Sequence, residues 1–221
     1  FFARNALRNA TLCFPVAEAF GRRIMDIAPR AKVEVLATST DTGKFVSGYA
    51  ERPKSILTVA TVANRQRAMI KGLDRFRELA AVMPDYKFTI IGVYDSFRAF
   101  FEPVPANLEL LPGVAYEELP AYYRKASFYA QFSRSEGLPN SLCEAMLCGC
   151  IPLGTDVGDI ADAVGESGMV TPGWNANAIA DFVRKNHNKE LLRQLSRNRI
   201  IEKYNPDIRR NRLQHLFNKV Y

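Results

Sequence analysis

The residues most able to do chemistry are two carboxylates in the stretch SRSEGLPNSLCEAMLCGC, residues 133–150. Glu136 precedes a Gly-Leu-Pro turn, and Glu144 lies inside the apolar run that follows. Ser141 to Glu144 fits the S-x-x-E capping box, which from spacing alone is the favoured explanation of Glu144, and Glu136 could simply offset a helix dipole. Carboxylates also accept hydrogen bonds from vicinal hydroxyl groups. The pair is therefore a candidate for holding a sugar.

The turn between these acids predicts an anion site. In an open α/β sheet, ligands bind where the carboxyl ends of strands meet the amino termini of helices. A strand is expected at 128–132, and the next helix is expected to begin at Asn140 or Ser141. Its first amides lack acceptors within the helix, so together with the helix dipole they favour a bound phosphate. Gly137 would let a ligand approach the backbone closely.

A second cluster carries positive charge. The stretch NRQRAMIKG, residues 64–72, places Arg65, Arg67 and Lys71 after another expected strand. Cations at the carboxyl end of a strand can hold a diphosphate and stabilise it as a leaving group. A solvated basic loop is the simpler explanation of one such cluster, but two clusters at the same edge of a parallel sheet favour a binding site.

Other catalytic and metal-binding patterns are absent from the sequence. There is no G-x-x-x-x-G-K-[ST] and no G-x-G-x-x-G after a strand, which argues against a P-loop and a dinucleotide site. No Asp-x-Asp pair indicates a metal-bound diphosphate, and no serine, histidine and acid grouping is visible. The four cysteines form no C-x-x-C pair and fit small buried hydrophobes in a reducing compartment. We therefore expect no metal and no cofactor.

The elements that must position these groups alternate along the chain. Apolar strand-like runs are separated by helical runs and short loops, which is typical of right-handed βαβ units. The sequence therefore predicts an α/β fold, a Rossmann-like doubly wound parallel sheet. Strands are expected at 56–62, 87–92, 108–111, 128–132, 151–153 and 169–170, and helices at 70–83, 117–126, 141–148 and beyond 175.

The layout predicts three parts. Residues 51–205 are expected to form the complete sheet-containing domain, and residues 206–221 a final helix that leaves it. Residues 1–50 are expected to be a remnant of another domain with a linker, too small to fold alone. The remnant would contain strands at 12–16 and 32–36 around a helix at 17–28, and the polar linker would begin at residue 38.

Charge and hydropathy limit the kinds of partner. The formal charge of +7 favours anionic partners, although ordinary solubility charge also explains it. No apolar run approaches the ~20 residues that a membrane span needs. The first residue is phenylalanine, so we expect the chain to begin inside a longer protein.

The sequence also resembles a known family over nearly its whole length. EGLPNSLCEAMLCGCIPLGTDVGDIAD resembles the donor-binding signature of retaining glycosyltransferases of family four, which have the GT-B fold. ILTVATVANRQRAMIKGLDRF resembles the first strand, basic loop and helix of that family's C-terminal half, and FTIIGV resembles its second strand. LLPGVAYEELPAYYRKASFYAQFSRSEG resembles the segment that leads into the signature. VEVLATSTDTGKF resembles the segment that links the two halves.

The resemblance implies roles for individual residues. Glu136 would hold hydroxyl groups of the donor sugar, Lys71 would pair with the diphosphate, and Glu144 would accept from the ribose diol. Glu136, Lys71 and Arg65 are the implied catalytic residues. The other implied contacts to the nucleotide sugar are Arg67, the turn residues Gly137, Leu138 and Pro139, the amides of Asn140, Ser141 and Leu142, and the backbone of Gly113 and Val114 beside the base.

Two positions depart from the family's pattern. The family usually carries arginine where this chain has Thr61, and its linker usually has Asn-Gly where this chain has Thr38-Ser39. Arg65 is the expected replacement for the missing arginine because its distance from Lys71 is suitable, and Arg67 is the second candidate.

The resemblance implies an enzyme activity. The parent enzyme would transfer a glycosyl group from a nucleoside diphosphate sugar to an acceptor with retention, in polysaccharide or glycoconjugate biosynthesis. Protein cations and helix amides would stabilise the departing diphosphate, so no metal is expected. A saccharide or lipid-linked acceptor would be bound through an N-terminal domain. The implied location is the cytoplasm, and the basic C-terminal helices could touch anionic lipid, although solvated outer faces explain them more simply.

Two alternatives are left open. A nucleotide-sugar 2-epimerase of GT-B fold would bind similar donors but needs further catalytic acids. A non-catalytic module, binding either sugar nucleotides or nucleic acid, is the second alternative. Nucleic acid is not expected as a partner, because no RNA-binding motif with interleaved aromatic residues is found.

Overall fold

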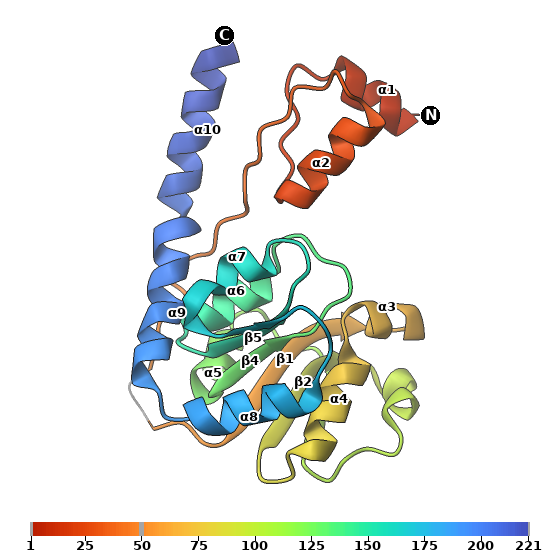
Figure 1. Ribbon diagram of the computed structural model, residues 1–221, viewed down its shortest axis with the longest axis vertical. Helices are drawn as coiled ribbons and strands as arrows, with labels where there is room; N and C mark the ends of the chain where they lie inside the picture. The colour runs from red at the N-terminus through yellow and green to blue at the C-terminus, as the bar shows by residue number, and fades with distance from the viewer. Residues whose placement is uncertain (1, 49–50, 221) are drawn as a thin grey trace.

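A parallel sheet flanked by helices forms the part of the molecule that lies away from both termini (Figure 1). The computed structural model describes residues 2–48 and 51–220, and within them six strands pair in the order β3-β2-β1-β4-β5-β6. Every neighbouring pair is parallel. The order changes direction between β1 and β4, and ligands of doubly wound sheets bind at such a point. The strands are β1 (Ser55–Val62), β2 (Lys87–Val93), β3 (Leu108–Leu111), β4 (Phe128–Gln131), β5 (Ile151–Thr155) and β6 (Met169–Thr171).

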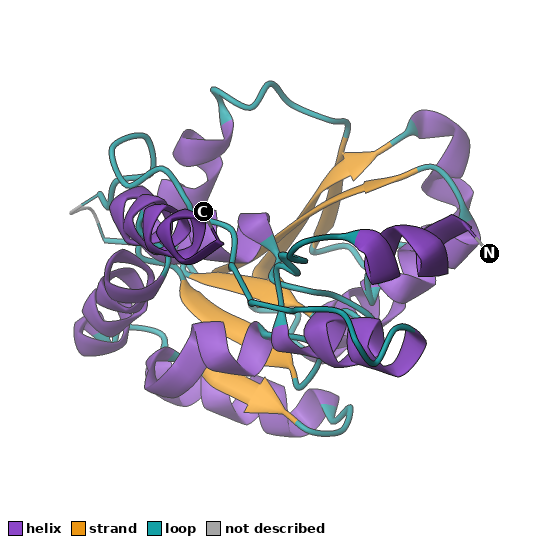
Figure 2. Ribbon diagram, turned by 90° about the horizontal axis from the view of Figure 1, so that it is seen from above, coloured by secondary structure: helices purple, strands orange, loops and turns teal. Residues whose placement is uncertain are grey.

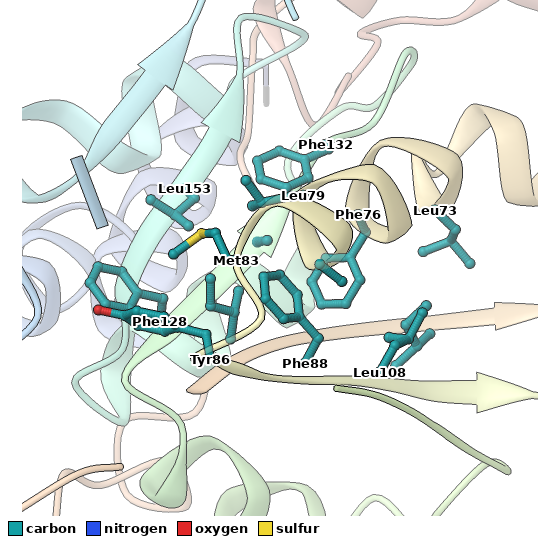
Figure 3. Packing of buried hydrophobic residues seen from close by; sticks show 14 of the residues in the cluster. Leu73, Phe76, Leu79, Met83, Tyr86, Phe88, Leu108, Phe128, Phe132 and Leu153 are labelled. Carbon is teal, nitrogen blue, oxygen red and sulfur yellow. The ribbon is translucent and has the colours of Figure 1, made fainter. Parts of the chain in front are cut away.

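Helices cover both faces of the sheet (Figure 2), and each face has its own apolar core. On one face, Leu73, Phe76 and Leu79 of α4 lie over Phe88 and Leu108 of the sheet (Figure 3). Every residue of β4 and β5 is buried, because helices cover the sheet on both sides. Burial on both faces explains why these strands have mostly apolar sequences. The helices of the first face are α4 (Leu73–Val82) and α8 (Ala176–Asn186), and those of the second are α5 (Leu119–Lys125), α6 (Asn140–Leu147), α7 (Ile160–Val164) and α9 (Glu190–Lys203).

The predicted α/β fold is confirmed, with one change beside the candidate site. The helix expected at 70–83 begins later, as α4, and the expected basic loop before it forms a separate short helix, α3 (Arg65–Ile70). Gly72 adopts a left-handed conformation (φ 69°), which ends one helix and opens the next. Asn64 starts α3, because its side chain accepts a hydrogen bond from the amide of Arg67 at 2.8 Å. Short 3-10 turns lie at Asp95–Phe101 and Gly165–Ser167.

The two strands predicted near the amino terminus are wrong. Residues 12–16 and 32–36 meet only in an isolated parallel bridge between Cys13 and Val33. Three backbone hydrogen bonds of 2.8–3.0 Å join the segments, and Pro15 has no N–H to extend the ladder. The predicted helix is confirmed as α2 (Glu18–Ile27), and α1 (Phe2–Asn9) precedes it without having been predicted.

The linker and the last helix lead away from the sheet. No helix or strand forms in the described part of the predicted linker, while residues 49 and 50 lie outside the described residues. α10 (Pro206–Val220) extends past the sheet toward the side where α1 and α2 lie (Figure 1). Arg209 ties it to the chain before the linker by donating to the carbonyl oxygens of Leu36, at 2.9 Å, and Ala37. Among the described residues, no helix has the length and apolar character needed to cross a membrane.

Candidate functional site

The two predicted acids lie near each other in the chain segment that leaves β4. Glu136 belongs to the loop that follows β4, and Glu144 belongs to α6, the next helix. Because β4 lies beside β1 in a parallel sheet, the loops that follow these two strands share the carboxyl edge. Lys71 enters from the segment that follows β1. The fold therefore brings the predicted acid loop and the predicted basic loop to one edge.

Glu136 and Lys71 form an ion pair at this edge. The carboxylate also accepts from the hydroxyl of Ser133 at 3.2 Å and from the side-chain amide of Gln131 at 3.3 Å. The side chains of Glu136 and Lys71 keep 14% and 26% of their exposure. The pair is thus partly covered but open to solvent, as a site for a soluble ligand must be.

A close backbone approach sets the position of Lys71. A Cβ atom on Gly72 would lie 1.9 Å from the carbonyl oxygen of Phe132, at the end of β4. The amide of Arg134 donates to the carbonyl of Ile70 at 2.7 Å across the same contact. The turn between α3 and α4 therefore lies directly against the start of the Glu136 loop, which is why the lysine and the acid meet although they are far apart in sequence.

Glu144 is buried and held by two phenols. One carboxylate oxygen accepts from the hydroxyl of Tyr116 at 3.2 Å, and the other accepts from that of Tyr123 at 3.0 Å. The capping-box explanation of Glu144 is wrong. α6 begins at Asn140, one residue before Ser141, and within the described residues no side chain makes a capping hydrogen bond to the start of this helix. The hydroxyl of Ser141 instead lies 2.8 Å from that of Tyr129.

Burial governs the protonation of this group. Desolvation raises the pKa of the Glu144 carboxyl above its usual value, against the opposing effect of the hydrogen bonds from Tyr123 and Tyr116. Burial and the nearby Glu144 charge raise the pKa of Tyr116 to about 12, so this phenol keeps its proton and donates. The Glu144 carboxylate therefore accepts one hydrogen bond at each oxygen, both from tyrosine hydroxyls.

The turn before α6 is packed against neighbouring elements. Leu138 and Leu142 pack in the apolar core, and the carbonyl of Gly137 accepts from the amide of Asp159 at 3.0 Å. A Cβ atom on Gly137 would lie 2.7 Å from the ring of Phe20, which belongs to α2. The face of Gly137 that a side chain would occupy therefore contacts α2 and is not open space. Of the predicted positions here, Gly137, Leu138, Pro139 and Leu142 are buried, Ser141 is half-buried and Asn140 is exposed.

The two predicted arginines are not joined to the acid. Arg65 is exposed, and its guanidinium carbon lies 5.8 Å from the ring centroid of Phe100. Arg67 is also exposed. Among the described residues, no hydrogen bond or ion pair connects either side chain to Glu136. The structure therefore brings Lys71 to Glu136 and leaves both arginines outside that contact.

The residues predicted to lie beside the base belong to the loop between β3 and α5. Gly113 is exposed, and a Cβ there would have no neighbour within 4 Å. Val114 is half-buried against the core of the second face. Tyr116 of the same loop reaches Glu144, so this loop borders the site.

Several polar residues of the site were not predicted from the sequence. Gln131 is buried at the end of β4, where its amide reaches Ser133 at 2.8 Å as well as Glu136. Its amide oxygen lies 3.3 Å from the hydroxyl of Tyr129, which continues the network to Ser141. The sequence did contain a sign of this network, a glutamine at the end of the otherwise apolar strand FYAQF. A buried polar side chain needs hydrogen-bond partners, so this glutamine predicts polar neighbours at the end of the strand.

The surroundings give no separate metal site. No group of three or more His, Cys, Asp or Glu side chains in residues 2–48 and 51–220 could hold a metal ion.

All four cysteines are buried and free, as predicted, and burial raises the pKa of Cys143 and Cys148 to about 12. A cavity of about 800 Å³ lies between α4 and the segment before β3, and none of the predicted site residues lines it.

Comparisons of sequence point to one family. The model of a family described as Glycosyl transferases group 1 matches residues 53–188 of this chain. The uncharacterized glycosyltransferase MJ1178 of Methanocaldococcus jannaschii is 29% identical over 116 residues. That alignment covers 50% of this chain and 33% of the relative, so the chain spans about a third of that protein.

Comparisons of structure agree on the fold. Sucrose-phosphate synthase from Thermosynechococcus elongatus matches 99% of this chain and 60% of its own, with a TM-score of 0.83 at 18% identity. Anabaena Alr3699/HepE, solved with UDP and glucose, matches 98% of this chain and 66% of its own, with a TM-score of 0.83 at 13% identity. The C-terminal domain of the Francisella tularensis group 1 protein LpcC matches 76% of this chain and 100% of its own, with a TM-score of 0.62 at 20% identity.

These matches confirm the expectation of a GT-B glycosyltransferase architecture. The chain spans less than two thirds of the sucrose-phosphate synthase and HepE structures. The sheet order and the acid loop after β4 fall inside the matched range. Since the family model covers more than half of the sequence, this chain belongs to the glycosyl transferases group 1 family.

Proposed function

We propose that this chain is the donor-binding part of a retaining glycosyltransferase of family four, and that it binds a nucleoside diphosphate sugar at the carboxyl edge of the sheet. The observation that carries the proposal is the Lys71–Glu136 pair beside the start of α6, in a chain of this family. A lysine, free helix amides and a sugar-binding acid at one edge are what a diphosphate with an attached sugar requires.

Each group has a role in the proposed reaction. Lys71 and the first amides of α6 neutralise the diphosphate as the bond to the anomeric carbon breaks, which lowers the barrier to departure. Glu136 accepts from hydroxyl groups of the sugar, and Glu144 accepts from the ribose. Lys71 pairs with Glu136 in the structure, so donor binding would replace or share this ion pair.

The remaining roles follow the family resemblance. Arg65, with Arg67 as second choice, would supply charge near the phosphates, and the backbone of Gly113 and Val114 would lie beside the base. Because Arg65 lies over Phe100, it must turn away from that ring to reach a phosphate. The HepE complex with UDP and glucose makes UDP the first nucleotide to test. We expect no metal requirement.

The whole protein's activity lies beyond the donor site. We propose an acceptor-binding N-terminal domain, of which residues 1–50 are a part, with residues 51–205 as donor domain and 206–221 as a helix that packs on the N-terminal domain. A role in polysaccharide or glycoconjugate biosynthesis, a cytoplasmic location and peripheral membrane contact stay predictions. An assay of the full protein for glycosyl transfer, with the configuration of the product, tests retention and separates transfer from epimerisation.

The donor site is tested by ligand-induced thermal stabilisation with UDP, GDP and their sugars, against an oligonucleotide at the same salt concentration. Glu136→Ala and Glu144→Ala should each reduce the shift that the nucleotide sugar gives. Glu109→Ala is the matched control, because Glu109 pairs with Lys87 on an exposed part of the sheet. If both site variants keep the full shift, the proposed function is wrong. An oligonucleotide that stabilises more than any nucleotide would have the same consequence.

A further inference from the structure

Tyr116 covers the acid that the proposed function assigns to the ribose, and the inference below rests on that function. Glu144 retains only 6% of its exposure, and each of its oxygens accepts a hydrogen bond from a tyrosine hydroxyl. A ribose diol offers the same kind of donor as these phenols. A carboxylate can accept about four hydrogen bonds, but burial leaves Glu144 no open approach beside the two phenols, so a ribose can reach it only if one tyrosine moves aside.

The two tyrosines are not equally able to move. Tyr123 belongs to α5 and is fully buried, with its ring packed edge-on against Tyr129 at 5.8 Å between centroids. Tyr116 is 48% exposed and lies on the loop between β3 and α5. A fully buried ring cannot leave without opening a cavity, whereas a half-exposed loop residue can rotate into solvent. Tyr116 is thus the partner that can be displaced.

Residues that precede the sheet hold Tyr116 in place. The ammonium of Lys44 lies 3.7 Å from the Tyr116 ring centroid, and the ring of Phe45 meets it edge-on at 5.7 Å. Lys44 is in turn 3.5 Å from Glu117, the next residue of the same loop. The phenol is therefore held over Glu144 by contacts that do not involve its hydroxyl.

We propose that Tyr116 is a gate on nucleotide binding. Its hydroxyl donates to the Glu144 carboxylate at the position where a hydroxyl of the ribose would donate. The donor must break the Tyr116–Glu144 hydrogen bond to bind. The opposite role, in which Tyr116 orients Glu144 for the ribose, predicts the opposite effect when the hydroxyl is removed. The sign of that effect decides between them.

Tyr116→Phe is the decisive variant because it removes only the competing hydroxyl and keeps the ring contacts with Lys44 and Phe45. A hydrogen bond of this kind corresponds to roughly a fivefold change in affinity. We expect titration calorimetry to show about fivefold tighter binding of the nucleoside diphosphate that the wild-type chain prefers among UDP, GDP, ADP and CDP. The 2′,3′-dideoxy form of that nucleotide should bind both proteins equally.

Three further variants complete the test. Tyr122→Phe, on the adjacent helix, is the matched control and should leave both affinities unchanged. Lys44→Ala should shift the affinity in the same direction as Tyr116→Phe, because it loosens the gate without touching Glu144. In a Glu144→Gln background, which alters the acceptor that Tyr116 and the ribose compete for, the gain from Tyr116→Phe should shrink.

The outcomes separate this proposal from the proposed function. If the wild-type chain binds the nucleotide and Tyr116→Phe weakens or does not change that binding, the gate is overturned while the donor site stands. An equal gain for the dideoxy nucleotide would also overturn it, because the gain would then not involve the ribose. If neither the wild type nor Tyr116→Phe binds any nucleoside diphosphate, the proposed function fails and the gate fails with it.

Discussion

The two acids of the site have different surroundings although both follow β4. Glu136 faces a lysine and two neutral donors in a partly open position, and Glu144 faces two phenols in a buried one. Burial raises the pKa of Glu144 among its neutral donors, whereas Glu136 lies beside the cation of Lys71. The two residues are therefore suited to different partners, a sugar beside a diphosphate for Glu136 and a neutral diol for Glu144.

The raised pKa of Glu144 predicts a pH-dependent stability. A carboxyl whose pKa is higher in the folded state favours folding most below its unfolded pKa, and this contribution is lost as pH rises through the folded pKa. Glu144→Gln cannot lose a proton, so its free energy of unfolding relative to wild type should improve between pH 4 and pH 7. Urea denaturation at the two pH values measures this difference.

The exposed Glu109 supplies the control for that experiment. Glu109→Gln removes a carboxyl that is 43% exposed and far from the site, so we expect little change relative to wild type over the same range. If the free energy of unfolding of Glu144→Gln falls relative to wild type as the pH rises, the burial argument is contradicted.

Lys71 is expected to matter for binding more than for folding. Lys71→Ala leaves Glu136 with its bonds from Ser133 and Gln131, so the chain should remain folded. Loss of one cation from a diphosphate site should weaken nucleotide binding about tenfold, as expected for a charge-assisted contact of about 1.5 kcal/mol. Calorimetric titration checks this, with Lys87→Ala as control. Equal affinities for Lys71→Ala and the control would remove Lys71 from the site.

At the scale of elements, the turn between α3 and α4 couples β1 to β4. The turn lies against the carbonyl of Phe132, and Arg134 donates to the carboxylate of Asp74 at 2.8 and 2.6 Å beside it. Because Lys71 precedes this turn, its position depends on how closely the two backbones pack. The site is therefore set by backbone contact between two loops and not by Lys71 alone.

Gly72→Ala tests that dependence. The left-handed conformation disfavours a side chain, and a Cβ would also collide with the Phe132 carbonyl, so we expect a loss of at least about 2 kcal/mol in stability. Chemical denaturation measures it. Gly173→Ala is the control, since a Cβ there meets nothing within 4 Å and should cost far less. Similar losses for both glycines would contradict the close approach.

At the scale of the whole molecule, arginines connect the segments that flank the sheet domain to it. Arg52 is buried and donates to the carbonyl of Ala126 at 2.6 Å, at the end of α5. Arg197 of α9 donates to the carbonyl of Phe45 at 3.1 Å. Carbonyls at helix ends and in loops have no partner in the regular structure, and guanidinium groups supply several donors at once. Part of the positive charge of the chain therefore has a structural use.

Arg209→Ala should release α10 from residues 36 and 37. We expect faster amide hydrogen exchange in α10 with unchanged exchange in the sheet, because the Arg209 side chain donates only to the carbonyls of Leu36 and Ala37 within the described residues. Arg210→Ala is the matched control, since Arg210 is 64% exposed and pairs within its own helix with Asp207. Equal exchange in the two variants would show that Arg209 does not hold the helix.

The sequence by itself determined the sheet and the order of its elements. Apolar runs such as ILTVATV and FTIIGV predict mostly buried strands inside the sheet, because burial on both faces demands mostly apolar residues. The acids around the Gly-Leu-Pro turn also follow from local order, since Glu136 must leave β4 and Glu144 must lie early in the next helix. These features depend on residues close in sequence.

Only the tertiary structure decided which side chains meet. The partners of Glu144 come from α5 and the loop before it, and Lys71 reaches Glu136 because Gly72 lets two backbones touch. The segments at 12–16 and 32–36 have strand-like sequences but make a single bridge, because a strand exists only when neighbours complete its hydrogen bonds. Contacts between distant residues depend on how loops close over the sheet, and no local pattern of apolar and polar residues encodes that closure.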